Sequence, residues 1–265
     1  MVIARVPHGE SIVHPGSRCP RCGHAIRWWE NVPLLSWLLL RGRCSGCQAP
    51  ISPRYPLIEL LTGLLFVGCL LRTGGGWPLV RALLMVGFLV PLAAIDLEHW
   101  VLPFELTLPG IALALLTAIP LGRPTLISCL IGAAVAFGGF WALELGLRML
   151  LGKEALGAGD KWLFALVGAF LGWQPLFGVL LFSNVQGAVV GGALLLVRGR
   201  AGPPAPVEGA PAAGDDDWAP GPTHLPFGPW IAVAALEVLL LGPWLLATFP
   251  GPLTRMLVGA HWWWW

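Results

Sequence analysis

From Leu57 onward the sequence consists of apolar runs separated by short polar, glycine-rich or proline-rich segments. A helix that crosses a membrane needs about 20 apolar residues, with a range of about 17–25. The runs predict helices at 57–72, 78–96, 105–121, 125–148, 161–173, 175–197 and 228–249. Only 11% of the residues are charged, against about 25% in a soluble domain. We therefore expect an all-α polytopic membrane protein with about seven transmembrane helices, and we assign its transmembrane domain to residues 57–265.

The preceding segment, residues 1–56, is basic. It contains seven arginines but only two acidic residues, Glu10 and Glu30. Because positive charge is concentrated in the cytoplasmic segments of membrane proteins, this segment is expected in the cytoplasm. Its arginines are diluted by cysteine, proline and tryptophan, so we expect no nucleic-acid partner. Residues 1–18 are polar and show no cleavable signal peptide.

Two Cys-x-x-Cys pairs, Cys19/Cys22 and Cys44/Cys47, lie 21 residues apart in this basic segment. Two such knuckles present four thiolates in the arrangement that tetrahedral zinc prefers, with Zn–S distances of about 2.3 Å. Two disulfides would require an oxidising compartment, which the arginine content argues against, and free thiols are a third reading. The spacing favours a small cytoplasmic zinc-binding domain, residues 1–56.

Two aspartates lie at the ends of apolar runs. Asp96 ends the second run, and Asp160 precedes the fifth, directly after Gly157-Ala158-Gly159. If the N-terminal segment is cytoplasmic, successive crossings bring both aspartates to the cytoplasmic face. Four arginines fall on the opposite side and weaken this assignment without reversing it: Arg72, Arg81, Arg123 and Arg255.

Two neighbouring carboxylates share one proton, because both cannot ionise cheaply. The ionised member can take a proton from water while the protonated member polarises a peptide carbonyl, which is aspartyl-protease chemistry. A single aspartate at a helix end more often caps backbone N–H groups. The shared face of Asp96 and Asp160, together with the glycines before Asp160, favours the catalytic reading.

These residues also fall within a motif order that resembles the type IV prepilin peptidases, bacterial membrane aspartyl proteases of the GxGD class. The matching segments are 15–22, 28–33, 36–37, 42–47, 50–59, Ile95-Asp96-Leu97, Leu102-Pro103, Gly157-x-Gly159-Asp160 and Phe227-Gly228-Pro229. The resemblance spans nearly the whole chain.

The resemblance implies that Asp96 and Asp160 are the catalytic pair and that the four cysteines bind structural zinc. It implies prepilin or pseudopilin substrates, whose basic leader is cut at the cytoplasmic face of the bacterial inner membrane, beside the substrate's apolar helix. It further implies N-methylation of the new N-terminus with S-adenosylmethionine, for which no cofactor site can be named.

The chain departs from the family pattern at three places. Family members usually carry a further membrane helix before the segment matched by Arg5-Val6-Pro7. Phe104 stands where many members have an acidic residue, and Lys161 directly follows Asp160. If the Lys161 side chain reached back, its ammonium would favour an ionised Asp160.

Other polar residues lie within the predicted spans. The resemblance favours a substrate-positioning role for Glu59, whereas Glu144 is expected to be paired or close to the interface. Asn184 and Gln186 are expected to hydrogen-bond between helices. Outside the spans, residues 201–226 are expected to form a flexible cytoplasmic linker whose acidic run, residues 215–217, is solvated. The tryptophans of residues 262–265 suit the outer membrane interface.

Two other classes of function remain open at this point. A small transporter or channel could relay protons or cations through Asp96, Asp160 and Glu59, although the aspartates lie at one face and no inverted repeat is evident. A membrane scaffold could recruit a partner through its zinc domain, and such a scaffold would need no carboxylate pair.

Overall fold

The structure is a computed structural model, and it describes residues 2–12, 14, 16–151, 157, 159–198 and 225–259. The elements are α1 (Val2–Arg5), η1 (Val6–His8), η2 (Trp28–Asn31), α2 (Leu35–Leu39), α3 (Arg54–Thr73), α4 (Gly76–His99), α5 (Phe104–Ala118), η3 (Ile119–Leu121), α6 (Arg123–Leu151), α7 (Asp160–Leu171), α8 (Leu176–Arg198), α9 (Gly228–Thr248) and α10 (Pro252–Val258). Within these ranges the only strand-like pairings are two isolated β-bridges. The predicted all-α class is confirmed.

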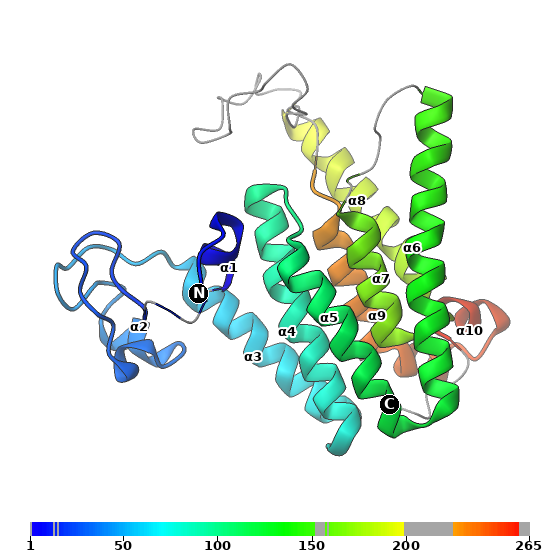
Figure 1. The fold of residues 1–265 in the computed structure, drawn as a ribbon, viewed down its shortest axis with the longest axis horizontal. Helices are drawn as coiled ribbons and strands as arrows, with labels where there is room; N and C mark the ends of the chain where they lie inside the picture. The colour runs from blue at the N-terminus through cyan, green and yellow to red at the C-terminus, as the bar shows by residue number, and fades with distance from the viewer. Residues whose placement is uncertain are drawn as a thin grey trace.

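Long helices form a bundle, and the N-terminal segment with its cysteines lies beside that bundle (Figure 1). Six helices of the described part are long and apolar enough to cross a membrane: α3, α4, α5 extended by η3, α6, α8 and α9. All of them occur where the apolar runs predicted spans. Most of the linker 201–226 and the tryptophan tail at 262–265 lie outside the described residues.

The fifth predicted span is α7, which has only 12 residues. At 1.5 Å per residue it is about 18 Å long, too short to cross a hydrocarbon core of about 30 Å. Yet α7 is the most enclosed helix, buried at its first residue and without a break from Leu163 to Leu171. It packs against α4, α5, α6, α8 and α9. A helix can end within the membrane when surrounding protein, rather than lipid, meets its terminal backbone groups.

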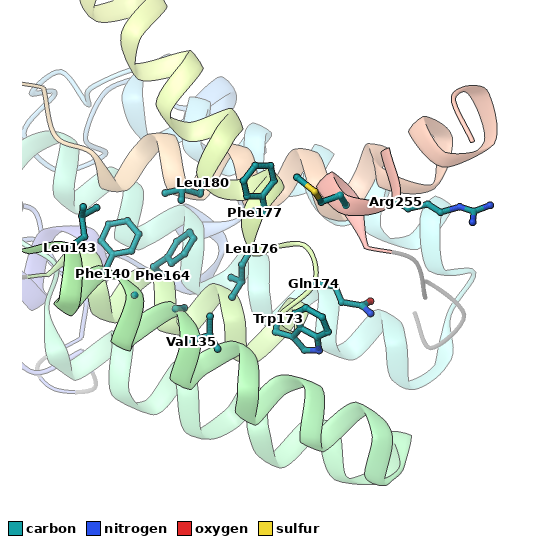
Figure 2. A pocket seen from close by; sticks show the side chains of 13 residues that line it. Val135, Phe140, Leu143, Phe164, Trp173, Gln174, Leu176, Phe177, Leu180 and Arg255 are labelled. Atoms are coloured by element: carbon teal, nitrogen blue, oxygen red, sulfur yellow. The ribbon is translucent and has the colours of Figure 1, made fainter. Parts of the chain in front are cut away.

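The helix α10 was not predicted. It packs against α8 and α9 after the last span, and its seven residues are too few to produce a strong periodic signal. A cavity of about 760 Å³ lies between α10, α6 and the turn from α7 to α8. Figure 2 shows Phe140, Phe164 and Phe177 around this cavity, whereas the side chain of Arg255 extends away from it.

Candidate active site and metal centre

Asp96 lies in the last turns of α4 and is only 6% exposed. Its Oδ2 atom accepts a hydrogen bond of 3.0 Å from the backbone N–H of Gly228, the first residue of α9. The free N–H groups at a helix start carry partial positive charge, so α9 presents a favourable environment to this carboxylate. A β-carbon on Gly228 would lie 2.5 Å from Asp96 Oδ2. A larger residue at this position would therefore displace the Asp96 carboxylate.

Asp160 is the first residue of α7 and is also 6% exposed. Its backbone N–H donates to the carbonyl oxygen of Gly157 at 3.1 Å. The next glycine, Gly159, approaches Leu102 so closely that an added β-carbon would lie 2.8 Å from Leu102 Cβ. The glycines of this motif thus allow a close approach of the chain, and Gly159 itself has an ordinary helical φ of −78°.

The structure brings the two predicted aspartates together. Asp96 lies in the last turn of α4 and Asp160 is the first residue of α7, and these two helix ends lie at the same end of the bundle (Figure 1). Leu163, one turn after Asp160, lies against the same Gly228 that binds Asp96. Two buried acids are therefore held near each other by the start of α7, the end of α4 and the start of α9. The cavity of Figure 2 is lined by neither aspartate.

Lys161 does not reach back to Asp160. Its Nζ donates to Oε2 of Glu144 on α6 at 2.8 Å. The expectation that Glu144 is paired is confirmed, and the ammonium group is held away from the aspartates. The next residue, Trp162, stacks edge-on against Phe104 with ring centroids 5.7 Å apart. Phe104 therefore contributes an aromatic contact beside the start of α7.

Sequence reasoning misread Arg81, which it counted as a charge on the outer side. The side chain is 1% exposed, inside the bundle. Its guanidinium donates to the carbonyl oxygens of Ala114, Ala169 and Phe170, to Thr117 Oγ1 and to Cys129 Sγ. The carbonyls of residues 169 and 170 belong to the last turn of α7, where a cation is favoured by the helix dipole. Arg81 thus caps the C-terminal end of α7, the short helix that begins with Asp160.

Other polar residues of the spans have specific partners. The Glu59 carboxylate accepts the backbone N–H of Leu34 at 2.8 Å, so it joins the N-terminal segment to α3. Gln186 on α8 donates to Glu237 on α9 at 2.5 Å, which confirms its interhelical role. Asn184 instead donates to a carbonyl of its own helix.

The four cysteines of the N-terminal segment converge. Their sulfur atoms all lie within 4.8 Å of one another, with Cys19 to Cys47 at 3.8 Å and Cys22 to Cys44 at 4.0 Å. A tetrahedron with Zn–S bonds of about 2.3 Å has edges of about 3.8 Å. The donor set and its dimensions therefore fit a zinc ion.

The two knuckles share one backbone pattern. In the first, the N–H of Gly23 donates to the carbonyl of Cys19, and Gly23 has the left-handed φ of 71°. In the second, Gln48 donates to Cys44 with a φ of 58°. In the second knuckle the left-handed position is thus occupied by Gln48 and not by a glycine. Backbone N–H groups of Cys22 and Arg21 lower the pKa of Cys19 to about 6. The backbone N–H of His24 lowers the pKa of Cys22, but burial and the neighbouring thiols outweigh it and raise that pKa to about 11, so Cys19 is the more readily ionised of the two.

Beside the cysteines, the His24 ring interacts with Glu30 at 3.3 Å and with Ser45 at 3.1 Å. The backbone N–H of Arg27, with smaller contributions from Ser45 and His24, holds the pKa of Glu30 below its usual value. His24 is therefore engaged with these neighbours.

Comparison with known proteins agrees with this geometry. Residues 83–192 match the model of the type IV leader peptidase family, and residues 1–73 match the bacterial peptidase A24 N-terminal domain. A relative from Myxococcus xanthus (strain DK1622) is 48% identical over 98% of this chain and 90% of its own length. The chain belongs to the type IV leader peptidase family.

Further members of the family are similar over most of the chain. A relative from Aeromonas hydrophila is 42% identical over 90% of this chain and 77% of its own length. A relative from Pseudomonas aeruginosa (strain PAO1) is 36% identical over 90% of this chain and 76% of its own length. All three relatives are named prepilin leader peptidase/N-methyltransferase. No solved structure matches the chain.

Membership of the leader peptidase family, together with six apolar helices, makes the chain a multi-pass inner-membrane protein. The matches give no support to the transporter alternative.

Proposed function

We propose that this protein is a membrane aspartyl endopeptidase that removes the leader peptide of type IV prepilins or pseudopilins, with Asp96 and Asp160 as its catalytic pair. The observation that carries the proposal is that these two carboxylates are both buried at the same end of the bundle, on either side of Gly228 and Leu163. The names of the relatives supply the substrate class.

In the proposed mechanism the pair shares one proton. The ionised carboxylate takes a proton from a water molecule, and the resulting hydroxide attacks the scissile carbonyl carbon. The protonated carboxyl polarises the carbonyl oxygen, and the nitrogen of the broken peptide bond leaves as the new N-terminal amine after it gains a proton. The hydrogen bond from Gly228 to Asp96 keeps one carboxylate in a fixed orientation during this exchange.

We place this site at the cytoplasmic face. The proposal is supported by the basic character of residues 1–56, which contain seven arginines against two acidic residues. A substrate whose apolar helix lies in the membrane would then present its basic leader junction at the level of Asp96 and Asp160.

A structural zinc site and a second activity are also part of the proposal. Residues 1–56 would form a domain in which Cys19, Cys22, Cys44 and Cys47 hold a structural zinc ion that crosslinks the knuckles, while residues 57–265 form the peptidase domain. The relatives' names also support N-methylation of the new N-terminus, with S-adenosylmethionine as methyl donor.

A cleavage assay in detergent tests the proposal. Wild-type protein, Asp96→Asn and Asp160→Asn would each be incubated with a prepilin, and the products identified by mass spectrometry. We expect cleavage at the leader junction by wild type and by neither variant. Glu105→Gln is the matched control, because it removes an exposed carboxylate from the first turn of α5.

Equal cleavage by the Asn variants would remove both aspartates from the mechanism. A mass increase of one methyl group on the mature product, dependent on added S-adenosylmethionine, would establish the methyltransferase activity. Its absence from an otherwise active preparation would refute that part alone.

A further inference from the structure

The short helix α2 has its apolar face turned outward. Leu35, Leu38 and Leu39 are spaced i, i+3 and i+4, so they lie on one side of the helix. All three are exposed, and Leu39 is 82% exposed. Trp37, between them in sequence, instead faces its own domain, where Nε1 donates to the carbonyl of Ile51. A domain surrounded by water on every side would not present such a face.

Two exposed tryptophans lie on the element next to α2. Trp28 and Trp29 belong to η2, which packs against α2, and their rings meet edge-on with centroids 5.5 Å apart. Trp28 is 78% exposed. We call the five residues Leu35, Leu38, Leu39, Trp28 and Trp29 the outer apolar patch. Tryptophan beside leucine is the combination that favours a membrane–water interface.

The depth of α2 agrees with such a location. Leu34, immediately before α2, donates its N–H to Glu59 on α3. Glu59 lies about 7.5 Å along the helix axis from the first residue of α3, which is Arg54. Arg54 pairs with Glu98, so this charged pair marks the polar end of both α3 and α4. Because the Glu59 side chain leans toward the start of α3, the start of α2 is held beside the first turns of α3, near this polar end, where interfacial helices lie.

The charges around the patch are basic. Residues 11–53 contain five arginines and a single acidic residue, Glu30. Arg27 lies over the ring of Trp29, with its guanidinium carbon 5.3 Å from the ring centroid, and the exposed Arg41 and Arg43 follow α2 directly. Arginines close to a bilayer are attracted to anionic lipid headgroups.

We propose that the outer apolar patch inserts into the membrane leaflet beside α3, with Arg27, Arg41 and Arg43 bound to anionic phospholipid headgroups. The cysteine domain then rests on the bilayer as a peripheral element and does not project freely into solvent. Figure 1 shows the arrangement that this requires, because α2 lies beside the first part of α3 and not beyond the end of the bundle.

Site-directed spin labelling of the full chain tests the proposal. A spin-labelled amino acid, introduced by genetic encoding so that the cysteines stay intact, would be placed at Leu35 or Leu38. Arg21 is the matched control position, since it is exposed but lies on the first cysteine knuckle. Each chain would be reconstituted in nanodiscs of phosphatidylcholine alone or of phosphatidylcholine and phosphatidylglycerol in equal parts. The measured quantity is the ratio of relaxation by oxygen, which partitions into lipid, to relaxation by a water-soluble nickel chelate.

We expect this ratio to be several-fold higher at both leucine positions than at Arg21, and to rise further with phosphatidylglycerol. The double variant Arg41→Gln/Arg43→Gln should abolish that further rise. Equal ratios at Leu35, Leu38 and Arg21 would overturn the proposal and leave the patch as a contact for a protein partner or a second copy of the chain. A high ratio that does not respond to phosphatidylglycerol would overturn the assignment of anionic lipid.

Discussion

Gly228 is the position of the candidate site at which we expect the smallest substitution to disturb catalysis, because it lies against Asp96. An alanine there would put its β-carbon 2.5 Å from Oδ2 and 3.1 Å from Cγ of the carboxyl group, so the acid must move. Because a displacement of about 1 Å in a reacting group costs on the order of a hundredfold in rate, we expect Gly228→Ala to lower prepilin cleavage to that extent. The measurement is the single-turnover cleavage rate in detergent.

The control for this substitution is Gly87→Ala. Gly87 lies on α4, the same helix as Asp96, and an added β-carbon would meet nothing within 4 Å. Cleavage by this variant should match wild type, since alanine also has the higher helix propensity. If Gly228→Ala cleaved at the control rate, the hydrogen bond from α9 would have no part in positioning Asp96.

Among individual residues, the sequence predicted those whose role can be recognised from the neighbouring residues in the chain. Asp96 and Asp160 are visible because each carboxylate ends an apolar run, and their shared face follows from counting crossings. The environment of Arg81 depends on three helices that are distant in sequence, and nothing near position 81 indicates that its partners are carbonyls of α7. The partner of Lys161 was missed for the same reason.

At the scale of elements, the position of α7 depends on both of its ends. Arg81 binds its last turn and three further acceptors on α5 and α6. Since each buried acceptor left unpaired costs about 1–3 kcal/mol, we expect Arg81→Gln to destabilise the protein by about 3 kcal/mol or more. Thermal unfolding in detergent should show a lower midpoint and an accompanying loss of cleavage. Arg123→Gln, an exposed arginine at the start of α6, is the control and should unfold like wild type.

The two cysteine knuckles form a second element whose order depends on its metal. The four cysteines form no disulfide. Within the segment the two knuckles contain only an isolated β-bridge each and few buried apolar side chains, so zinc would be the main crosslink between them. We therefore expect Cys44→Ser to lose stoichiometric zinc, measured by elemental analysis, and to raise hydrogen exchange over residues 17–50. Cys69→Ala, near the C-terminal end of α3 and outside the cysteine knuckles, should keep the zinc. Full zinc content in Cys44→Ser would exclude the four-cysteine ligand set.

Helix positions were predictable because a membrane helix is a long apolar run, which is visible in the sequence. The structure has a helix at every predicted run. The apolar runs could not reveal that α7 ends within the bundle. A helix end at that depth is stable only because the neighbouring helices surround its terminal backbone groups. The outward apolar face of α2 was also missed, because a five-residue helix carries too short a pattern to assign a direction.

At the scale of the whole molecule, charge asymmetry sets the orientation that the proposed reaction needs. With Arg81 inside the bundle, only Arg72, Arg123 and Arg255 of the described arginines remain as counted charges on the side opposite the aspartates. The aspartate side carries the basic segment 1–56. Removing Arg81 from the count therefore strengthens the prediction that the aspartates face the cytoplasm.

Reporter fusions test that orientation. Alkaline phosphatase, which is active only outside the cytoplasm, should be active when fused after Gly74 or Gly122, in the turns that follow α3 and η3. It should be inactive after Arg148, near the end of α6, while green fluorescent protein at that point should fluoresce. The opposite pattern would place Asp96 and Asp160 on the outer face, where a leader peptide that remains in the cytoplasm cannot reach them, and the proposed substrate would then be wrong even if the aspartates are catalytic.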